Sequence, residues 1–402
     1  MAPAARLQSS VPGKRPGPMT VVPRRRLLTI GHSYVVAANR RLAHEMAVQS
    51  GGSWDVTAVA PARYRADLGR IALQPLAGDA SRLEPLTMRL DRFPHLMWYA
   101  GLERVLDASW DVVHCWEEPY ILAGAQVARH TPRGATLVIA SFQNLVKRYP
   151  WPFSAFERST MARANGWIGF GQTVHDALAG RRGYADKPSR VIPPGVDLSR
   201  FRPDGAIRRQ TLDRLGWSSS DRVVGFLGRF VPEKGVLLLL DALRNATVPW
   251  RALFVGGGPL QTDLERFALE HPGRVHVANG VAHDEVPAWL SAMTLLCAPS
   301  QTTPGWREQF GRMLIEAMAC GVPVVASDSG EMPAVVGDAG VVVPERDVLA
   351  WTHTVDRLLG DDAVLRDLAA RGVERANARF GWPVVARAHL SFFEALMEGR
   401  AA

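Results

Sequence analysis

The sequence predicts an α/β protein built from two doubly wound domains that face a central cleft. Its 402 residues, of which 47% are hydrophobic and 21% charged, are enough for two domains of ordinary size. Short β-branched runs alternate with helical stretches, as in parallel sheets covered by helices on both faces. The series stops at a Pro- and Gly-rich stretch that ends near Gly205 and then starts again, which is typical of a domain boundary.

Ten apolar runs are predicted to form buried strands. In the first half they are RLLTI, DVTAVA, DVVHC, ATLVIA and WIGF, and in the second half RVVGFL, ALFVG, RVHVA, LLCA and VPVVA. We therefore assign residues 25–200 to a first domain and 201–380 to a second. Residues 381–402 have helical apolar spacing, so we expect an amphipathic helix able to pack back on the first domain.

The start of the chain and its charge limit the classes of function. Residues 1–24 are rich in Pro, Gly and basic residues and lack the apolar centre of a signal peptide, so we expect a disordered basic leader. No apolar run is long enough to predict a membrane span. We expect a cytoplasmic protein, with peripheral binding at the inner face of the membrane as a further option. The net charge of +8 makes a nucleoside diphosphate, an anionic membrane surface and nucleic acid all candidate partners, and charge alone does not choose among them. Nucleic acid is not expected, because no binding signature accompanies the charge.

No metal site or cofactor is expected. Cys115, Cys297 and Cys320 each lie inside an apolar run, which is typical of reduced thiols. The adjacent side chains of the triplet HDE, residues 283–285, point in different directions. We therefore expect the triplet to begin a helix and not to bind a metal.

The most informative motif is EQFGRMLIEAMACGVPVVASDSG, residues 308–330. We expect a short helix from Gly311 to Cys320, with Glu308 on the loop before it and Glu316 about two turns in. Carboxylates suit sugar hydroxyls because each accepts two hydrogen bonds, and the amides at a helix N-terminus suit a diphosphate. An isolated pair of glutamates at this spacing would more often be ordinary helix residues.

A second cluster follows the first strand of the second half. Arg229 comes directly after that strand and Lys234 within the next turn, at the carboxyl end where α/β sheets bind ligands. The two cations could neutralise a departing nucleoside diphosphate, or they could be solvated surface charges. Gly257 belongs to the run VGGGP, which would let a ligand approach the backbone but does not spell a dinucleotide fingerprint.

Taken in order, LGRFVPEKG, FVGGGPL, NGVAHDEVPAWLSAM and EQFGRMLIEAMACGVPVVASDSGEMPAVV resemble the retaining glycosyltransferases of family 4, the group 1 transferases with the GT-B fold. The resemblance is dense over residues 223–347 and thinner in DVVHCWEEPY, SFQNLVKRYP and VIPPGVDLSRF. It implies that Glu316 holds the nucleotide ribose, Glu308 contacts the transferred sugar, and Arg229 and Lys234 bind the diphosphate. The remaining donor-binding candidates are Phe310, Gly311, Arg312, Met313, Leu314, Gly257 and, facing the base, Val281.

The reaction centre and the acceptor side are predicted in the first half. The resemblance implies that His114, at the end of a buried strand, lies near the donor sugar; the alternative is a histidine satisfied by backbone. Glu117, Glu118 and Asn144 are candidates for the acceptor side, and the two glutamates could equally be solvated. The resemblance further implies front-face transfer, in which the leaving phosphate oxygen helps deprotonate the acceptor hydroxyl. Neither a protein base nor a metal is then required.

We therefore expect a retaining hexosyltransferase that uses a UDP- or GDP-sugar and a glycan, lipid-linked or small-molecule acceptor. The alternatives are a GT-B-fold sugar-nucleotide 2-epimerase and a non-catalytic nucleotide-sugar binder. One stretch departs from the family pattern, because the first strand–helix loop has only Gly31 where many members have paired glycines. His32, Ser33, Asn39 and Arg40 either line a phosphate site there or face solvent.

Overall fold

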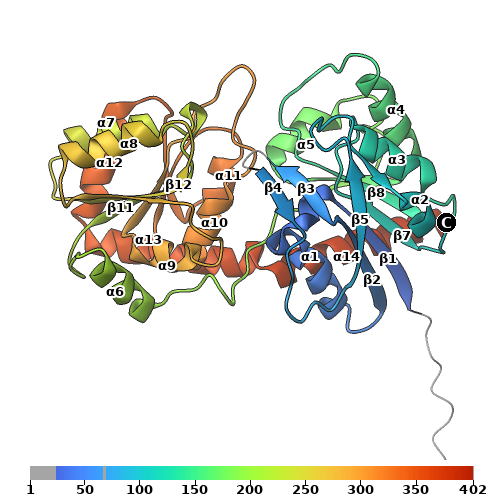
Figure 1. The fold of residues 1–402 in the computed structure, drawn as a ribbon, viewed down its shortest axis with the longest axis horizontal. Helices are drawn as coiled ribbons and strands as arrows, with labels where there is room; N and C mark the ends of the chain where they lie inside the picture. Colours follow the sequence, from blue (N-terminus) through green and yellow to red (C-terminus); the bar gives the residue numbers. More distant parts are fainter. Residues whose placement is uncertain (1–23, 67–68, 402) are drawn as a thin grey trace, which may run out of the picture.

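A computed structural model describes residues 24–66 and 69–401, so most of the leader predicted at residues 1–24 lies outside the described residues. The chain forms two α/β domains that lie side by side, the first drawn in blue to green and the second in yellow to orange (Figure 1). Within the described residues, no helix combines the length and the apolar character needed to cross a bilayer.

The first domain is built on an eight-stranded sheet in the order β10-β9-β8-β7-β1-β2-β5-β6. Its neighbouring strands are parallel except β5 and β6. The strands are β1 Arg25–Ile30, β2 Trp54–Pro61, β5 Arg82–Arg89, β6 Trp98–Ala100, β7 Val112–Cys115, β8 Thr136–Ser141, β9 Gly166–Gly169 and β10 Ser189–Val191, with a separate hairpin of β3 Arg63–Ala66 and β4 Gly69–Ala72. The helices are η1 His32–Val35, α1 Ala37–Gln49, α2 Leu102–Leu106, α3 Leu122–His130, α4 Phe153–Arg163 and α5 Gln172–Ala179.

The second domain has a six-stranded parallel sheet in the order β13-β12-β11-β14-β15-β16. The strands are β11 Val223–Arg229, β12 Arg251–Gly257, β13 Val275–Asn279, β14 Leu295–Ala298, β15 Val324–Ser327 and β16 Gly340–Val343. The helices are α6 Gly205–Arg214, η2 Pro232–Lys234, α7 Val236–Asn245, α8 Gln261–Glu270, α9 Val286–Ala292, α10 Arg312–Ala319, α11 Met332–Val336, α12 Val348–Leu359 and α13 Asp362–Arg375. The predicted fold class is confirmed, and each of the ten predicted runs forms a strand.

Both sheets reverse their chain order at one place. In the first sheet β1 lies between β2 and β7, and in the second β11 lies between β12 and β14. The loops that leave such neighbouring strands run to opposite faces of the sheet, which opens a crevice at their carboxyl ends. These two crevices are where ligands are expected.

The last helix joins the two domains. After η3 Ala376–Phe380, helix α14 Trp382–Ala401 returns to the first domain, where it packs along α1 (Figure 1). Its buried Trp382, Leu390 and Phe393 belong to the same hydrophobic cluster as Leu27 of β1 and Ile168 of β9. Burial of this apolar face holds α14 on the first domain although it follows the second in sequence.

Candidate active site

A pocket of about 410 Å³ opens at the β11–β14 crevice of the second domain. It brings together eight of the residues that the sequence predicted to bind the donor: Arg229, Lys234, Glu308, Phe310, Gly311, Arg312, Met313 and Glu316. Phe142 and Pro194, which precede the second domain in sequence, also line it. The pocket therefore combines both charges needed for a sugar diphosphate, cations for the phosphates and carboxylates for hydroxyls.

Two side chains contact the Glu308 carboxylate. Lys234 Nζ lies 2.5 Å from Glu308 Oε2, and Ser300 Oγ donates to the same oxygen at 2.9 Å. These donors offset the cost of burying the carboxylate. The backbone turns tightly beside it, since a Cβ on Gly330, whose φ is +60°, would lie 1.9 Å from the Glu308 carbonyl oxygen. A side chain at Gly330 would displace the Glu308 loop.

The start of α10 forms the floor of the pocket. Gly311 has a left-handed φ of 83° and precedes Arg312, the first helical residue. Amides at the start of a helix lack an i−4 acceptor and suit a phosphate oxygen, although here the Leu314 N–H donates to the Gly311 carbonyl at 2.9 Å. Glu316 is the fifth residue of α10, a little more than one turn in rather than two, and its Oε1 lies 3.6 Å from His283 Nε2.

Three predicted donor residues do not line this pocket. Leu314 is fully buried in the core of the second domain, because α10 directs that position inward. Val281 packs against the same core, and His283 lines the pocket in its place. The Gly257 carbonyl, at the end of β12, accepts the N–H of Phe230 at 2.9 Å. Gly257 therefore links the ends of β11 and β12 and does not line the pocket.

The two domains contact one another directly beside Glu308. Asn144 Nδ2 donates to the Glu308 carbonyl at 3.0 Å, and the Arg307 guanidinium donates to the Asn144 carbonyl. The side chain of Asn144, an acceptor-side candidate from the sequence, is thus buried in a contact between the domains. A further contact joins Arg312 NH1 to Asn39 Oδ1 at 2.7 Å.

His114 does not face the cleft. It is fully buried, its Nδ1 lies 3.2 Å from Thr29 Oγ1, and its ring lies 5.2 Å from those of both His389 and Phe393 on α14. Burial and the neighbouring His389 hold its pKa well below the usual value. The expectation that His114 lies beside the donor sugar is wrong in this structure, because β7 turns its side chain toward α14 and away from the strand ends.

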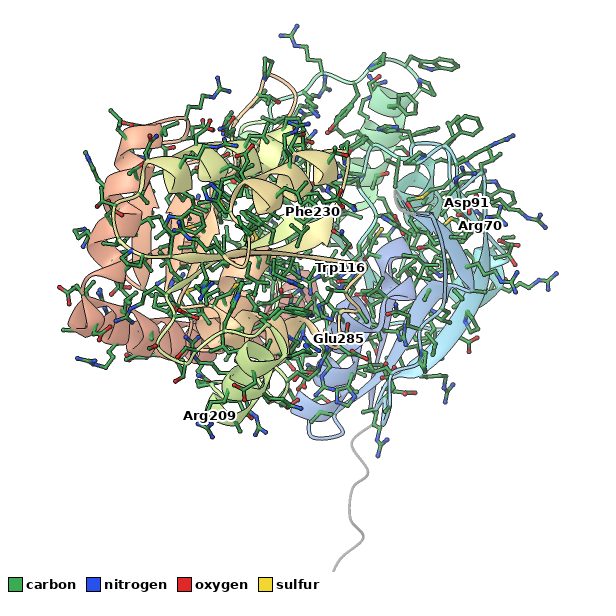
Figure 2. The ribbon with its side chains drawn as sticks, turned by 60° about the vertical axis from the view of Figure 1, so that its left-hand side comes forward. Arg70, Asp91, Trp116, Arg209, Phe230 and Glu285 are labelled. Carbon is green, nitrogen blue, oxygen red and sulfur yellow. The ribbon has the colours of Figure 1, made fainter. Side chains whose placement is uncertain are left out.

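Trp116, two residues further along, reaches the boundary between the domains (Figure 2). Its indole N–H donates to His114 Nδ1 at 3.2 Å, and its ring contacts Phe142 and Phe170. Aromatic packing therefore fills the space between the His114 strand and the pocket wall formed by Phe142.

Glu117 and Glu118 are bound by the protein, so the alternative that they are solvated loop charges is wrong. Glu117 is fully buried and accepts from His32, as described below. Glu118 accepts from Ser141 Oγ and from the Phe142 N–H, each at 2.7 Å. Burial raises the pKa of Glu118 to about 7 although both donors lower it.

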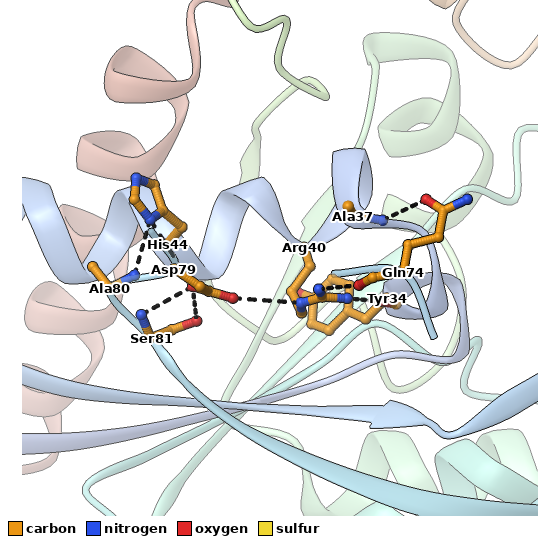
Figure 3. A network of polar contacts seen from close by, with 8 residues as sticks. All are labelled: Tyr34, Ala37, Arg40, His44, Gln74, Asp79, Ala80 and Ser81. Carbon is orange, nitrogen blue, oxygen red and sulfur yellow. Dashed lines mark hydrogen bonds and ion pairs between the residues drawn. The ribbon is translucent and has the colours of Figure 1, made fainter. Parts of the chain in front are cut away.

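Arg40 is held in a network of polar contacts around α1 (Figure 3). Its guanidinium donates to the carbonyls of Tyr34 and Gln74, each at 2.6 Å, and its Nε lies 3.5 Å from Asp79 Oδ2. Because the side chain is fully buried among these partners, Arg40 fixes the loop around α1 and neither lines a phosphate site nor faces solvent.

Glu331 was missed by the sequence analysis. It precedes α11 in the second domain, yet its two carboxylate oxygens accept the N–H groups of Gln172 and Thr173, at 2.7 and 2.8 Å, in the first turn of α5. A Cβ on Gly171 would lie 2.4 Å from Glu331 Cδ, so the fit depends on that glycine. No local pattern relates residues about 160 positions apart. As for metals, the part of the chain that the structure describes has no cluster of three His, Cys, Asp or Glu residues suited to one.

Two Rossmann-like domains with a charged pocket at a strand crevice define a GT-B fold. Comparison with known families agrees: residues 38–200 match the model of glycosyltransferase family 4, and residues 221–361 match that of glycosyl transferases group 1. The chain belongs to the group 1 glycosyltransferases of family 4.

The chain is similar to several curated relatives and, in fold, to solved structures. A D-inositol 3-phosphate glycosyltransferase of Xylanimonas cellulosilytica is 36% identical over 50% of this chain and 50% of its own. A GDP-mannose-dependent alpha-(1-6)-phosphatidylinositol monomannoside mannosyltransferase of Mycobacterium tuberculosis is 31% identical over 68% of this chain and 74% of its own. Against several such relatives, the chain spans about half of their length. Anabaena HepE in complex with UDP has the same fold, with a TM-score of 0.69 and 20% identity over 92% of this chain and 100% of its own.

Proposed function

We propose that this protein transfers a hexose from a UDP- or GDP-sugar to a hydroxyl group of an acceptor, with retention of the anomeric configuration. The observation that carries the proposal is the convergence of Arg229, Lys234, Glu308 and Glu316 on one pocket with the start of α10. Relatives named for a GDP-mannose donor and a structural neighbour solved with UDP support a nucleotide-sugar donor.

In the proposed mechanism the second domain stabilises the leaving group. Arg229, Lys234 and the start of α10 line one pocket, and in this mechanism they would stabilise the charge that develops on the departing diphosphate. Glu308 would accept hydrogen bonds from the transferred sugar and Glu316 from the ribose. The leaving phosphate oxygen would take the proton of the attacking hydroxyl, and no metal would be needed.

The acceptor side is proposed to be the first domain, at or near a membrane. The named acceptors of the relatives, inositol phosphate and phosphatidylinositol mannoside, make a phosphorylated polyol a reasonable class to test first. A membrane-facing surface is supported by the loop before α4, where Val146 and Trp151 are 78% and 81% exposed beside exposed Lys147 and Arg148. Exposed aromatic and basic side chains together favour an anionic lipid surface.

The test is a donor panel of UDP-, GDP- and ADP-sugars with release of nucleoside diphosphate as the readout. Each donor is assayed alone, with D-inositol 3-phosphate and with a phosphatidylinositol mannoside. The proposal expects acceptor-stimulated release, a retained anomeric configuration by NMR, and activity that survives EDTA. Conversion of the donor without acceptor would instead show a 2-epimerase, and nucleotide binding without turnover of any donor would show a non-catalytic binder.

A further inference from the structure

The first domain carries a polar cluster at its own crevice, between β1 and β7. His32 follows β1 and Glu117 follows β7, and these two strands are neighbours at the point where the chain order reverses. Ligands of open α/β sheets bind outside the strand ends at such a point. The pocket with Lys234 and Glu308 occupies the equivalent place in the second domain, between β11 and β14.

Glu117 holds the His32 ring in one orientation. The carboxylate is fully buried and accepts the backbone N–H of His32 at 2.6 Å, and its other oxygen lies 2.6 Å from His32 Nδ1. The Tyr99 hydroxyl donates to the same carboxylate at 2.5 Å. Because Nδ1 carries the proton shared with Glu117, Nε2 is the ring nitrogen left to meet a ligand. The His32 side chain is 30% exposed, whereas that of Glu117 is inaccessible.

The loop that carries His32 is connected to the donor pocket. The Ser33 carbonyl accepts from Asn39 Nδ2 at 3.0 Å, and Asn39 Oδ1 accepts from Arg312, which lines that pocket. On the other strand, the residue after Glu117 binds the N–H of Phe142, which lines it too. His32 is therefore linked through its neighbours to residues of the pocket proposed to hold the donor, and its side chain is partly exposed.

We propose that Nε2 of His32 accepts a hydrogen bond from a non-reacting hydroxyl of the acceptor, and that Glu117 is the positioning residue that orients the ring. The inference rests on the proposed transferase function. The reacting hydroxyl keeps its proton for the leaving phosphate oxygen, so His32 contributes acceptor binding and alignment, not proton transfer. The ligand class that fits is a polyol, since a polyol presents several neighbouring hydroxyl groups.

The protonation state of His32 decides whether Nε2 can accept a hydrogen bond from the acceptor hydroxyl. Burial lowers the pKa of His32, but the charge and hydrogen bond of Glu117 outweigh burial and the pKa lies above its usual value. The other groups that face the ring are Glu118, whose charge acts in the same direction, and the Tyr64 ring at 5.0 Å; Tyr99 stays protonated, because burial raises its pKa. Below the pKa of His32, Nε2 carries a proton and can only donate to a hydroxyl oxygen. The proposed contact, in which Nε2 accepts, therefore forms only above that pKa, and it predicts an acceptor affinity that rises with pH.

The experiment measures the acceptor KM and kcat/KM as functions of pH, with D-inositol 3-phosphate or the acceptor that the panel selects. His32→Gln should raise the acceptor KM about tenfold, the loss of one hydrogen bond, and abolish the acid limb of the profile. Glu117→Gln should move that limb to lower pH, because the carboxylate no longer raises the pKa of His32. The matched control is His130→Gln, an exposed histidine at the end of α3 in the same domain.

Affinity for UDP or GDP should stay within about twofold in all variants, since the second domain supplies the proposed nucleotide contacts. The inference is overturned if His32→Gln keeps the parent acceptor KM and acid limb, or if it weakens nucleotide binding as much as acceptor binding. If Glu117→Gln fails to fold, the His32→Gln profile decides alone. A parent enzyme that releases no nucleoside diphosphate from any donor overturns the proposed function and this inference with it.

Discussion

Lys234 Nζ lies 2.5 Å from Glu308 Oε2, so two residues expected to serve different parts of the donor contact one another. Glu308 reaches that position on the loop before α10, and Lys234 ends η2, 74 residues earlier. The pair places a cation and a carboxylate at adjacent points of the pocket, an arrangement that suits the proposed junction between a sugar and a diphosphate.

The first prediction concerns this pair. Lys234→Met and Glu308→Gln should each lower kcat/KM for the donor, and their effects should be strongly non-additive, with a coupling of about 1–3 kcal/mol, because each removal leaves the partner unpaired. A double-mutant cycle in kcat/KM measures the coupling. Purely additive losses would show that the two side chains act independently in the reaction.

A second prediction separates nucleotide binding from transfer. Glu316→Gln should weaken UDP or GDP binding by about 1.5–3 kcal/mol, the worth of one charged hydrogen bond, whereas Glu308→Gln should leave that affinity nearly unchanged and slow transfer. Isothermal titration beside the transfer assay distinguishes the two. Glu285→Gln is the control, an exposed carboxylate at the start of α9 (Figure 2). Equal nucleotide affinity in the parent and Glu316→Gln would remove Glu316 from the donor site.

A third prediction tests the contact across the domains. Glu331→Ala leaves the amides of Gln172 and Thr173 without their carboxylate, which should cost about 1–3 kcal/mol and open the domains, seen as a larger radius of gyration in small-angle scattering. Asp361→Ala, which removes a helix cap within the second domain, should lower stability without opening. An unchanged scattering curve for Glu331→Ala would contradict a role in holding the domains together.

A fourth prediction concerns acid stability. Burial lowers the pKa of His114, and lowers that of His389 to about 4. Below about pH 6.5 the unfolded chain therefore binds protons that the native state does not, and the free energy of unfolding falls with decreasing pH by up to about 1.4 kcal/mol per pH unit for each histidine. His389→Leu should flatten this slope in denaturant titrations between about pH 6.5 and 4. His130→Gln should keep the parent slope, and a parent slope in His389→Leu would refute the assignment.

The fifth prediction addresses the exposed loop before α4. The parent protein should co-sediment with anionic but not neutral vesicles, and Trp151→Ser or the pair Lys147→Gln and Arg148→Gln should reduce binding, each basic side chain contributing about 1 kcal/mol. Moderate salt should release the protein. Leu269→Ser, at an equally exposed site on α8 of the other domain, is the control. Equal binding of the parent to neutral and anionic vesicles, or loop variants that bind anionic vesicles as well as the parent does, would rule out this surface.

The fold, and most of the residues that line the candidate pocket, could be predicted from the sequence because both depend on local patterns. Strands such as β1 and β12 are apolar runs that can only be buried, and the strand–helix alternation leaves few topologies. Lys234 lies five residues after Arg229, the end of β11, and Glu316 lies eight residues after Glu308. Chain geometry alone therefore keeps Lys234 near Arg229 and Glu316 near Glu308.

On the first domain, one predicted site residue was wrong and one contact was not predicted, both for the same physical reason. The sequence determined that His114 ends a strand, but only packing of α14, about 275 residues later, decided that its ring is enclosed by Phe393 and His389. Likewise, the spacing of Glu117 could not show that its carboxylate meets His32, 85 residues away. Local sequence fixes which residues lie at strand ends, because backbone propensity and apolar periodicity act over a few residues. Which side chains meet there is decided by tertiary packing, because burial and charge pairing act through space between elements far apart in the chain.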